Sequence, residues 1–219
     1  MKWTINYMNY VGSYMSKIDF IQIGANVGKN KHDIIWILCR KNKWGGILVE
    51  PLPQSFELLK KNYSDVPNLL FEQAAIMPYD GETKFYFSPE FKNECQQAST
   101  VKNHFHVNTA TMTLPCMTIE SLVKKYGLLD TSFELLQIDV EGMDDKILLS
   151  TDFTRIIPKY IRYESIHLKG NRNMIVLEHL KKFGYRRIPD LYNDMTPFLP
   201  PGQTWPQGEP NFDTLVERI

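Results

Sequence analysis

The amino-acid sequence predicts an α/β fold in which a mostly parallel sheet is flanked by helices. Short apolar runs of strand length alternate with segments of helical length along most of the chain. Such alternation implies right-handed crossovers between parallel strands. The length of 219 residues and the hydrophobic content of 43% suit one α/β domain with a full core. We therefore expect a single domain over residues 1–219, with residues 1–17 as an N-terminal extension.

The elements of the N-terminal half follow from apolar runs and turn residues. The strand "IDFIQIG" leads into a helix whose "IIWILC" is apolar nearly all round, and "GGILVE" stops at Pro51. "YDGETKFYFS" has an Asp-Gly turn before alternating residues, which predicts a hairpin arm. The expected strands are 18–24, 45–50 and 68–76, and the expected helices are 29–41 and 54–63.

The C-terminal half begins after a polar, irregular stretch at 88–112, which we expect to be a loop on the substrate side. A second such loop is expected at the Pro-rich segment 189–210. Thr118 is placed to cap a helix over 119–126, and Gly184 to end a later one. The expected strands are 133–140, 159–168 and 212–219, and the other expected helices are 142–149 and 172–183.

Charge and composition exclude several classes of partner. Lys plus Arg and Asp plus Glu number 25 each, so no net field attracts nucleic acid or an anionic membrane. The first 17 residues contain no continuous apolar stretch, so we expect neither signal peptide nor membrane insertion. The three cysteines show no ligand spacing, which favours reduced thiols and a cytoplasmic protein. The composition leaves homo-oligomer formation open.

Polar residues follow the predicted strands at equivalent places. In parallel sheets, ligands bind at the carboxyl ends of the strands, so these residues predict a common site. They are Gly24 to Gly28, Glu50, Gln73, Asp139, Glu141, Glu164 and His167.

The glycine turn does not fit the phosphate-binding fingerprints. Gly24-x-x-x-Gly28 has Asn26 where a dinucleotide fingerprint has its middle glycine. "GANVGKN" is one residue short of a P-loop and lacks the hydroxyl for magnesium. S-adenosylmethionine instead needs a close backbone turn and an acid for its ribose hydroxyls, and Glu50 is placed for that role. Taken singly, the glycines could serve packing alone, and Glu50 could be a solvated carboxylate.

Five segments carry a family resemblance: "IGANVG", "GGILVEPLPQSFELLKKN", "AAIMPYDGETKFYF", "MTIESLVKKYG" and "LLQIDVEGMDDKIL". In order and spacing they resemble the FkbM family of S-adenosylmethionine-dependent methyltransferases, from about residue 18 to 168. "IDVEG" (138–142) is the most specific of them. The resemblance implies a class I (Rossmann-like) methyltransferase fold with a seven-stranded sheet. It also implies O-methylation of a sugar hydroxyl in a glycan or glycosylated natural product.

The resemblance assigns cofactor contacts residue by residue. Glu50 matches the ribose acid, and Gln73 with Ala74 lies where the adenine is expected. Gln22 stands where the family usually has an acid, and a neutral amide can still hydrogen-bond the methionine end. The expected contacts of S-adenosylmethionine are Gln22, Gly24, Ala25, Asn26, Gly28, Glu50, Pro51, Gln73, Ala74 and Asp139.

Methyl transfer also needs an aligned acceptor and a base for its proton. The candidates are Asp139, Glu141, Glu164 and His167, although Asp139 could instead cap the next helix and His167 could be an ordinary histidine. Asp144 and Asp145 are expected to complement that helix's dipole. The acids could hold a divalent ion, but nothing in the sequence requires one, so no metal ligand is predicted.

The expected substrate contacts are Ser99, Thr100, His104 and His106. Two other functions remain open: a non-catalytic binding module on the same fold and a Rossmann-type oxidoreductase.

Overall fold

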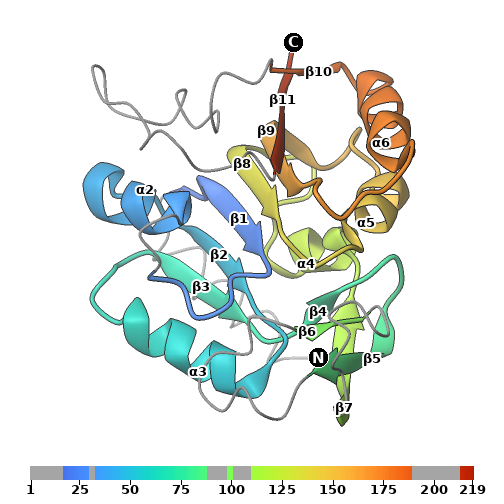
Figure 1. Cartoon of the computed structure of the whole chain (residues 1–219). Coiled ribbons are helices and arrows are strands. Elements are labelled where there is room, and N and C mark those ends of the chain that lie inside the picture. Colours follow the sequence, from blue (N-terminus) through green and yellow to red (C-terminus); the bar gives the residue numbers. More distant parts are fainter. Residues whose placement is uncertain (1–16, 30–32, 88–97, 101–109, 189–212) are drawn as a thin grey trace, which may run out of the picture.

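A seven-stranded sheet forms the centre of the molecule (Figure 1). The computed structural model describes residues 17–29, 33–87, 98–100, 110–188 and 213–219. Strand order is β10-β11-β9-β8-β1-β2-β3, in which β3, β2, β1, β8 and β9 run parallel, while β11 is antiparallel to both of its neighbours, β9 and β10. The strands are β1 Phe20–Ile23, β2 Gly46–Val49, β3 Leu69–Glu72, β8 Ser132–Ile138, β9 Ile157–Glu164, β10 Tyr185–Arg187 and β11 Asp213–Arg218. The predicted fold class is confirmed.

Helices cover both faces of this sheet, which gives three layers (Figure 1). The helices are α2 Ile34–Asn42, α3 Pro53–Asn62, α4 Ile119–Lys125, α5 Asp144–Ser150 and α6 Arg172–Lys181. Side chains along β1 point alternately to the two faces of the sheet. Phe20 packs with α2 and α3 on one face, whereas Ile21 and Ile23 pack with the other three helices on the opposite face. Burial of both sheet faces explains the nearly continuous apolar strands.

Helix starts are set by capping side chains. Thr118 caps α4 as predicted, since its hydroxyl accepts a 3.0 Å hydrogen bond from Ser121 N. The helix expected from residue 29 begins later, at Ile34, with Asp33 as its cap. Gly28 and Lys29 have φ values of 58° and 55°, which an α-helix does not accept.

A second, four-stranded sheet has the order β4-β7-β5-β6. Its strands are β4 Ala75–Ile76, β5 Gly81–Phe87, β6 Ala98–Ser99 and β7 Ala110–Met117. The strand predicted over 68–76 is therefore wrong as one unit, because β3 pairs with β2 and β4 pairs with β7. The predicted hairpin arm is β5, and its partner β7 begins inside the expected 88–112 loop. Pairing between such distant segments leaves no local signal at either strand.

The C-terminal segment also completes the main sheet. β11 was expected as a strand, whereas β10 in "YRRIP" was not assigned and is now seen to pair antiparallel with β11. The expected loop 189–210 lies outside the described residues, as does nearly all of the N-terminal extension. Among the helices of the described ranges, none has the length and apolar character needed to cross a membrane.

Candidate active site

The turn after β1 brings two strand ends into close contact. Gly24 N and Ala25 N both donate to Val49 O of β2, at 3.0 and 2.9 Å. Gly24 has a φ of 79°, and a Cβ atom there would lie 1.8 Å from Asp139 O. Only glycine fits both the left-handed backbone and this approach to the end of β8. The predicted cofactor loop is thus built against the predicted catalytic segment.

Gly28 packs the same turn against the end of α3. Its φ is 58°, and an added Cβ would lie 2.3 Å from Cε2 of Tyr63, just after α3. Asn62 donates its side-chain amide to Val27 O at 2.8 Å. The second glycine of the motif therefore fixes the turn against α3, and it is not among the residues that line the cavity described below.

Glu50 follows β2 and is held by two backbone amides. Its Oε2 accepts from Asn26 N and its Oε1 from Leu52 N, both at 2.9 Å. The residue is 5% exposed, and this burial raises the pKa of its carboxyl to about 7, while the two hydrogen bonds oppose the rise. Because each oxygen retains a further lone pair, the carboxylate is oriented and can still accept hydrogen bonds from a ligand.

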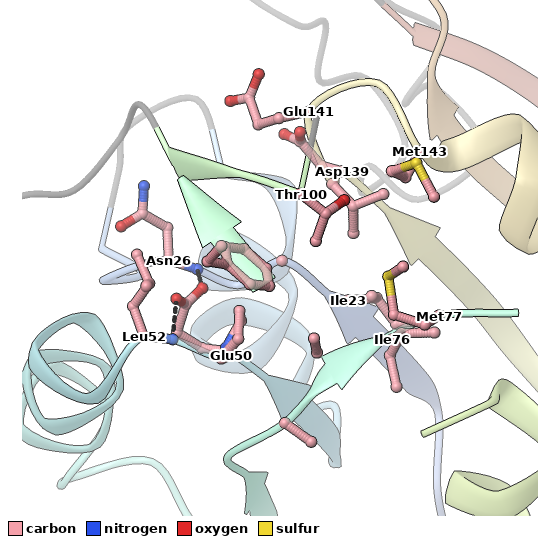
Figure 2. Close-up of a pocket in the computed structure, with 16 residues that line it drawn as sticks. Ile23, Asn26, Glu50, Leu52, Ile76, Met77, Thr100, Asp139, Glu141 and Met143 are labelled. Carbon is pink, nitrogen blue, oxygen red and sulfur yellow. Dashed lines mark hydrogen bonds between the residues drawn. The ribbon is translucent and has the colours of Figure 1, made fainter. Parts of the chain in front are cut away.

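A cavity of about 700 Å³ opens at the carboxyl ends of β1, β2 and β8. Figure 2 shows Glu50, Asn26 and Leu52 at one end, Asp139 and Glu141 at another, and Ile76 and Met77 on the apolar side. Its lining residues are Ile23, Gly24, Asn26, Glu50, Pro51, Leu52, Ala74, Ala75, Ile76, Met77, Phe85, Thr100, Asp139, Val140, Glu141 and Met143. Its mix of apolar walls with few polar groups is typical of a cofactor site.

Most predicted cofactor contacts lie on this cavity, and some do not. Those that line it are Gly24, Asn26, Glu50, Pro51, Ala74 and Asp139. Ala25 is buried in the core beside α2, and Gln73 is exposed outside the cavity lining. Sequence reasoning missed the apolar wall of Ile76, Met77, Phe85 and Met143, because apolar residues after a strand look like ordinary core.

Gln22 is buried and directly precedes Ile23, which lines the cavity. It is 4% exposed and is paired in register with Gln137 of β8. Its side chain hydrogen-bonds Asp33, which opposes the rise in that carboxyl's pKa caused by burial. Its Oε1 has no hydrogen-bond partner within the described ranges. The amide therefore bonds to the cap of α2, and it is not among the cavity-lining residues.

Asp139 faces the cavity at the end of β8 (Figure 2). Its backbone N donates to Ile23 O at 3.0 Å. It does not cap α5, whose N-cap position is Met143. Surrounding protein atoms and Asp213 raise the pKa of its carboxyl, and Arg162 opposes them. The carboxyl therefore binds a proton more readily than that of a free aspartate.

Glu141, Glu164 and His167 lie together beside Asp139. His167 Nε2 is 3.4 Å from Glu141 Oε2 and 3.6 Å from Glu164 Oε1. Burial raises the pKa of Glu141 to about 8 and that of Glu164 to about 9, and neighbouring carboxylates add to both shifts. Burial also lowers the pKa of His167. The four predicted base candidates are thus neighbours, although only Asp139 and Glu141 line the cavity.

The backbone at Glu141 is strained. Its φ is 56°, a left-handed conformation that costs a residue with a side chain about 1 kcal/mol or more. Ser99 Oγ donates to Glu141 O at 2.9 Å and so holds this turn from the second sheet. Ser99 thus acts through Glu141, and the next residue, Thr100, lines the cavity. The other expected substrate contacts, His104 and His106, lie outside the described residues.

Asp144 and Asp145 occupy the first turn of α5 as predicted, but both are buried. Asp145 accepts from Arg172, whose Nε is 2.7 Å from Oδ2. Asp144 is fully buried, and its Oδ2 accepts a long, 3.3 Å hydrogen bond from Gly142 N. Its Oδ1 has no partner in the part of the chain that the structure describes. Burial and Asp139 raise its pKa to about 8, so Asp144 belongs to the acidic surroundings of the site.

Comparison with protein families identifies one match. A family model described as "Methyltransferase FkbM domain" matches residues 22–187, which is most of the chain and covers every site residue described above. A search of curated protein sequences finds no significant match.

Solved structures show distant similarity to methyltransferases. The precorrin-6y C5,15-methyltransferase of Geobacter metallireducens GS-15 is 15% identical, with 84% of this chain and 72% of that chain covered and a TM-score of 0.41. The methyltransferase domain of bacterial CtHen1-C is 10% identical, with 98% and 96% covered and a TM-score of 0.44. A methyltransferase structure from Thermoplasma acidophilum, described as putative, is 10% identical, with 94% and 70% covered and a TM-score of 0.40.

Proposed function

The chain belongs to the FkbM methyltransferase family, and from this we propose that it transfers a methyl group from S-adenosylmethionine to an oxygen acceptor. The acceptor that we propose is a hydroxyl of a sugar in a glycan or a glycosylated natural product. Three features support the proposal: the family match, the cavity beside the glycine turn, and the acids beside that cavity.

The observation that carries the proposal is the position of Glu50. A buried carboxylate, oriented by Asn26 N and Leu52 N, forms part of the cavity wall. Its remaining lone pairs suit two neighbouring ribose hydroxyls. The apolar side chains of Ile76 and Met77 suit a flat adenine ring. Gly24 lines the cavity without a side chain, which lets its backbone approach the ligand closely. The residues present therefore fit S-adenosylmethionine.

The other end of the cavity supplies groups for the acceptor. S-adenosylmethionine contributes an electrophilic methyl group on a positively charged sulfur. The protein must orient the acceptor hydroxyl and accept its proton. Asp139 and Glu141 reach the cavity, and the raised pKa of each brings the carboxyl closer to neutral pH. A base whose pKa is near the working pH is the most effective, so we place proton transfer at these carboxylates.

Calorimetric titration of the purified chain with S-adenosylmethionine and S-adenosylhomocysteine tests the cofactor. We expect saturable binding of both, and at least about tenfold weaker binding in Glu50→Gln because the neutral amide accepts fewer hydrogen bonds. Glu57→Gln is the matched control, because Glu57 lies on the exposed side of α3 with its side chain 69% exposed. Equal affinity of Glu50→Gln and the wild type would contradict the assignment. Binding of a nicotinamide cofactor instead would identify an oxidoreductase.

Turnover separates an enzyme from a binding module. Incubation with isotope-labelled S-adenosylmethionine and a panel of glycans is expected to label a sugar oxygen, located by fragmentation mass spectrometry. Label on nitrogen or carbon would disprove O-methylation. Cofactor binding without label on any acceptor would support the non-catalytic module.

A further inference from the structure

Three side chains with metal-binding atoms meet at the ends of β8 and β9. They are Glu141, Glu164 and His167, and one ligand atom from each lies within 4.8 Å of the other two. The distances from His167 Nε2 to the glutamate oxygens are 3.4 and 3.6 Å. All three residues are partly buried, so their ligand atoms are only partly accessible to solvent.

We propose that Glu141, Glu164 and His167 bind a divalent cation. A tetrahedral ion with bonds of about 2.1 Å holds its ligand atoms about 3.4 Å apart. An octahedral ion holds adjacent ligand atoms about 3.0 Å apart and opposite ones about 4.2 Å apart. The measured separations fall within this range, so an ion fits with small side-chain movements. One imidazole nitrogen and two carboxylate oxygens suit Zn²⁺ or Mn²⁺.

A second, independent observation is a pair of buried carboxyl oxygens, on Asp144 and Glu164, that lack a hydrogen-bond partner among the described residues. Asp144 is fully buried, and its Oδ1 lacks a partner within the described ranges. Asp144 acts electrostatically on both Glu141 and Glu164. Glu164 Oε2 is likewise buried with no partner among the described residues. Neighbouring carboxylates repel one another unless one of them binds a proton or a positive charge lies between them.

The neighbouring arginines supply only part of that charge. Arg172 acts electrostatically on Asp144 but forms its ion pair with Asp145, and Arg162 forms its ion pair with Asp213. Lys169 is exposed and acts on His167, whose pKa it lowers together with burial. Without a metal, a proton on one of these carboxyls or on His167 would relieve the repulsion, and the experiment below separates these cases from a bound ion.

The location of the ion suits a role in binding the acceptor, an inference that rests on the proposed function. Glu141 contacts both the cavity and the proposed ion. Three protein ligands leave coordination positions open on a divalent ion. Two neighbouring hydroxyls of a sugar can occupy such positions, and the charge of the ion favours loss of a hydroxyl proton. The inference thus narrows the acceptor to one that presents a pair of adjacent oxygens.

Titration of the full chain with Mn²⁺ tests the site without cofactor or acceptor. After chelator treatment and its removal, Mn²⁺ binding is followed by loss of the aqueous electron paramagnetic resonance signal. We expect saturation at about one ion per chain and at least about tenfold weaker binding in Glu164→Gln and His167→Gln. Glu178→Gln is the control, since Glu178 is an exposed glutamate on α6. Circular dichroism confirms that each variant is folded.

Binding of the ion by the two variants as tightly as by the wild type would overturn the proposal. So would the absence of saturable binding, which would leave protonation within the cluster as the explanation. Because neither S-adenosylmethionine nor an acceptor is present, this result is independent of the proposed methyl transfer. Failure of the cofactor titration described above would leave the Mn²⁺ result unchanged.

Discussion

The two ends of the site differ in how their charged groups are stabilised. At the cofactor end, defined by the turn 24–28 and Glu50, a buried carboxylate accepts two backbone hydrogen bonds. At the acceptor end, defined by Glu141, Glu164 and His167, carboxylates lie beside further carboxylates and one backbone is left-handed. The first end is complete within the chain, because hydrogen bonds orient its acid. We propose that the second gains stability from an added positive charge.

The largest expected effect comes from breaking the close contact at the cofactor end. Gly24→Ala adds a Cβ where Asp139 O stands, at a φ of 79°. We expect a loss of unfolding free energy on the order of 4 kcal/mol, from backbone strain and overpacking together, and loss of S-adenosylmethionine binding. Urea denaturation and calorimetry measure both.

Gly127→Ala is the matched control for Gly24→Ala. Gly127 has a φ of 70°, but an added Cβ there meets nothing within 4 Å. It is therefore expected to show the backbone strain alone, about 1 kcal/mol, with unchanged cofactor affinity. Similar losses in the two variants would show that the approach of β1 to β8 is not the reason for the glycine.

An intermediate effect is expected from pH at the acceptor end. The pKa values of Glu141, Asp144 and Glu164 are raised to about 8 to 9 in the folded protein. The folded state then binds protons more tightly than the unfolded state, so stability is fully present below about pH 4 and falls as pH rises through 8 to 9. Without metal or cofactor, we expect a fall of about 2 kcal/mol from pH 5 to 9, allowing for solvent in the cavity.

Thermal denaturation at several pH values with a chelator present measures this slope. Asp144→Asn removes one of the repelling charges and is expected to flatten it. Asp145→Asn, on the same helical turn, removes the ion pair with Arg172 and is expected to lower stability at every pH. A wild-type stability that rises between pH 5 and 9 would contradict the view that the acceptor end is electrostatically unsatisfied.

The smallest effect is expected from the bond that holds Glu141. Ser99→Ala removes the 2.9 Å hydrogen bond to Glu141 O, which is expected to lower stability by about 1 kcal/mol. Because Ser99 acts through Glu141, the Mn²⁺ affinity is expected to fall as well. Ser150→Ala removes a bond of the same length, to Ile147 O on α5, and is expected to leave Mn²⁺ affinity unchanged. Equal Mn²⁺ affinity in Ser99→Ala and the wild type would show that this bond serves stability only.

Local patterns explain which elements could be predicted. Strands at 18–24 and 45–50 were recognisable because burial on both faces makes them apolar throughout, and Thr118 was recognisable because a cap acts on its own helix. The segment 68–76 was misread, since one apolar run supplies two strands that pair with different distant partners. Likewise, nothing near Ser99 in the sequence indicates that it bonds to Glu141, 42 residues away.

The sequence by itself determined the parallel sheet and the family, and it predicted the cofactor end of the site. Those features depend on residues within a few positions of one another: the glycine turn, the acid that ends the next strand, and the "IDVEG" segment. The tertiary structure decided which polar residues reach the cavity, excluding Gln73 and adding the wall of Ile76, Met77, Phe85 and Met143. It also decided that Glu164 and His167 meet Glu141, because only the pairing of β8 with β9 brings those segments together. The spacing of residues in the sequence specifies local turns. A cluster of charged side chains from separate strands, in contrast, forms only when those strands pack together.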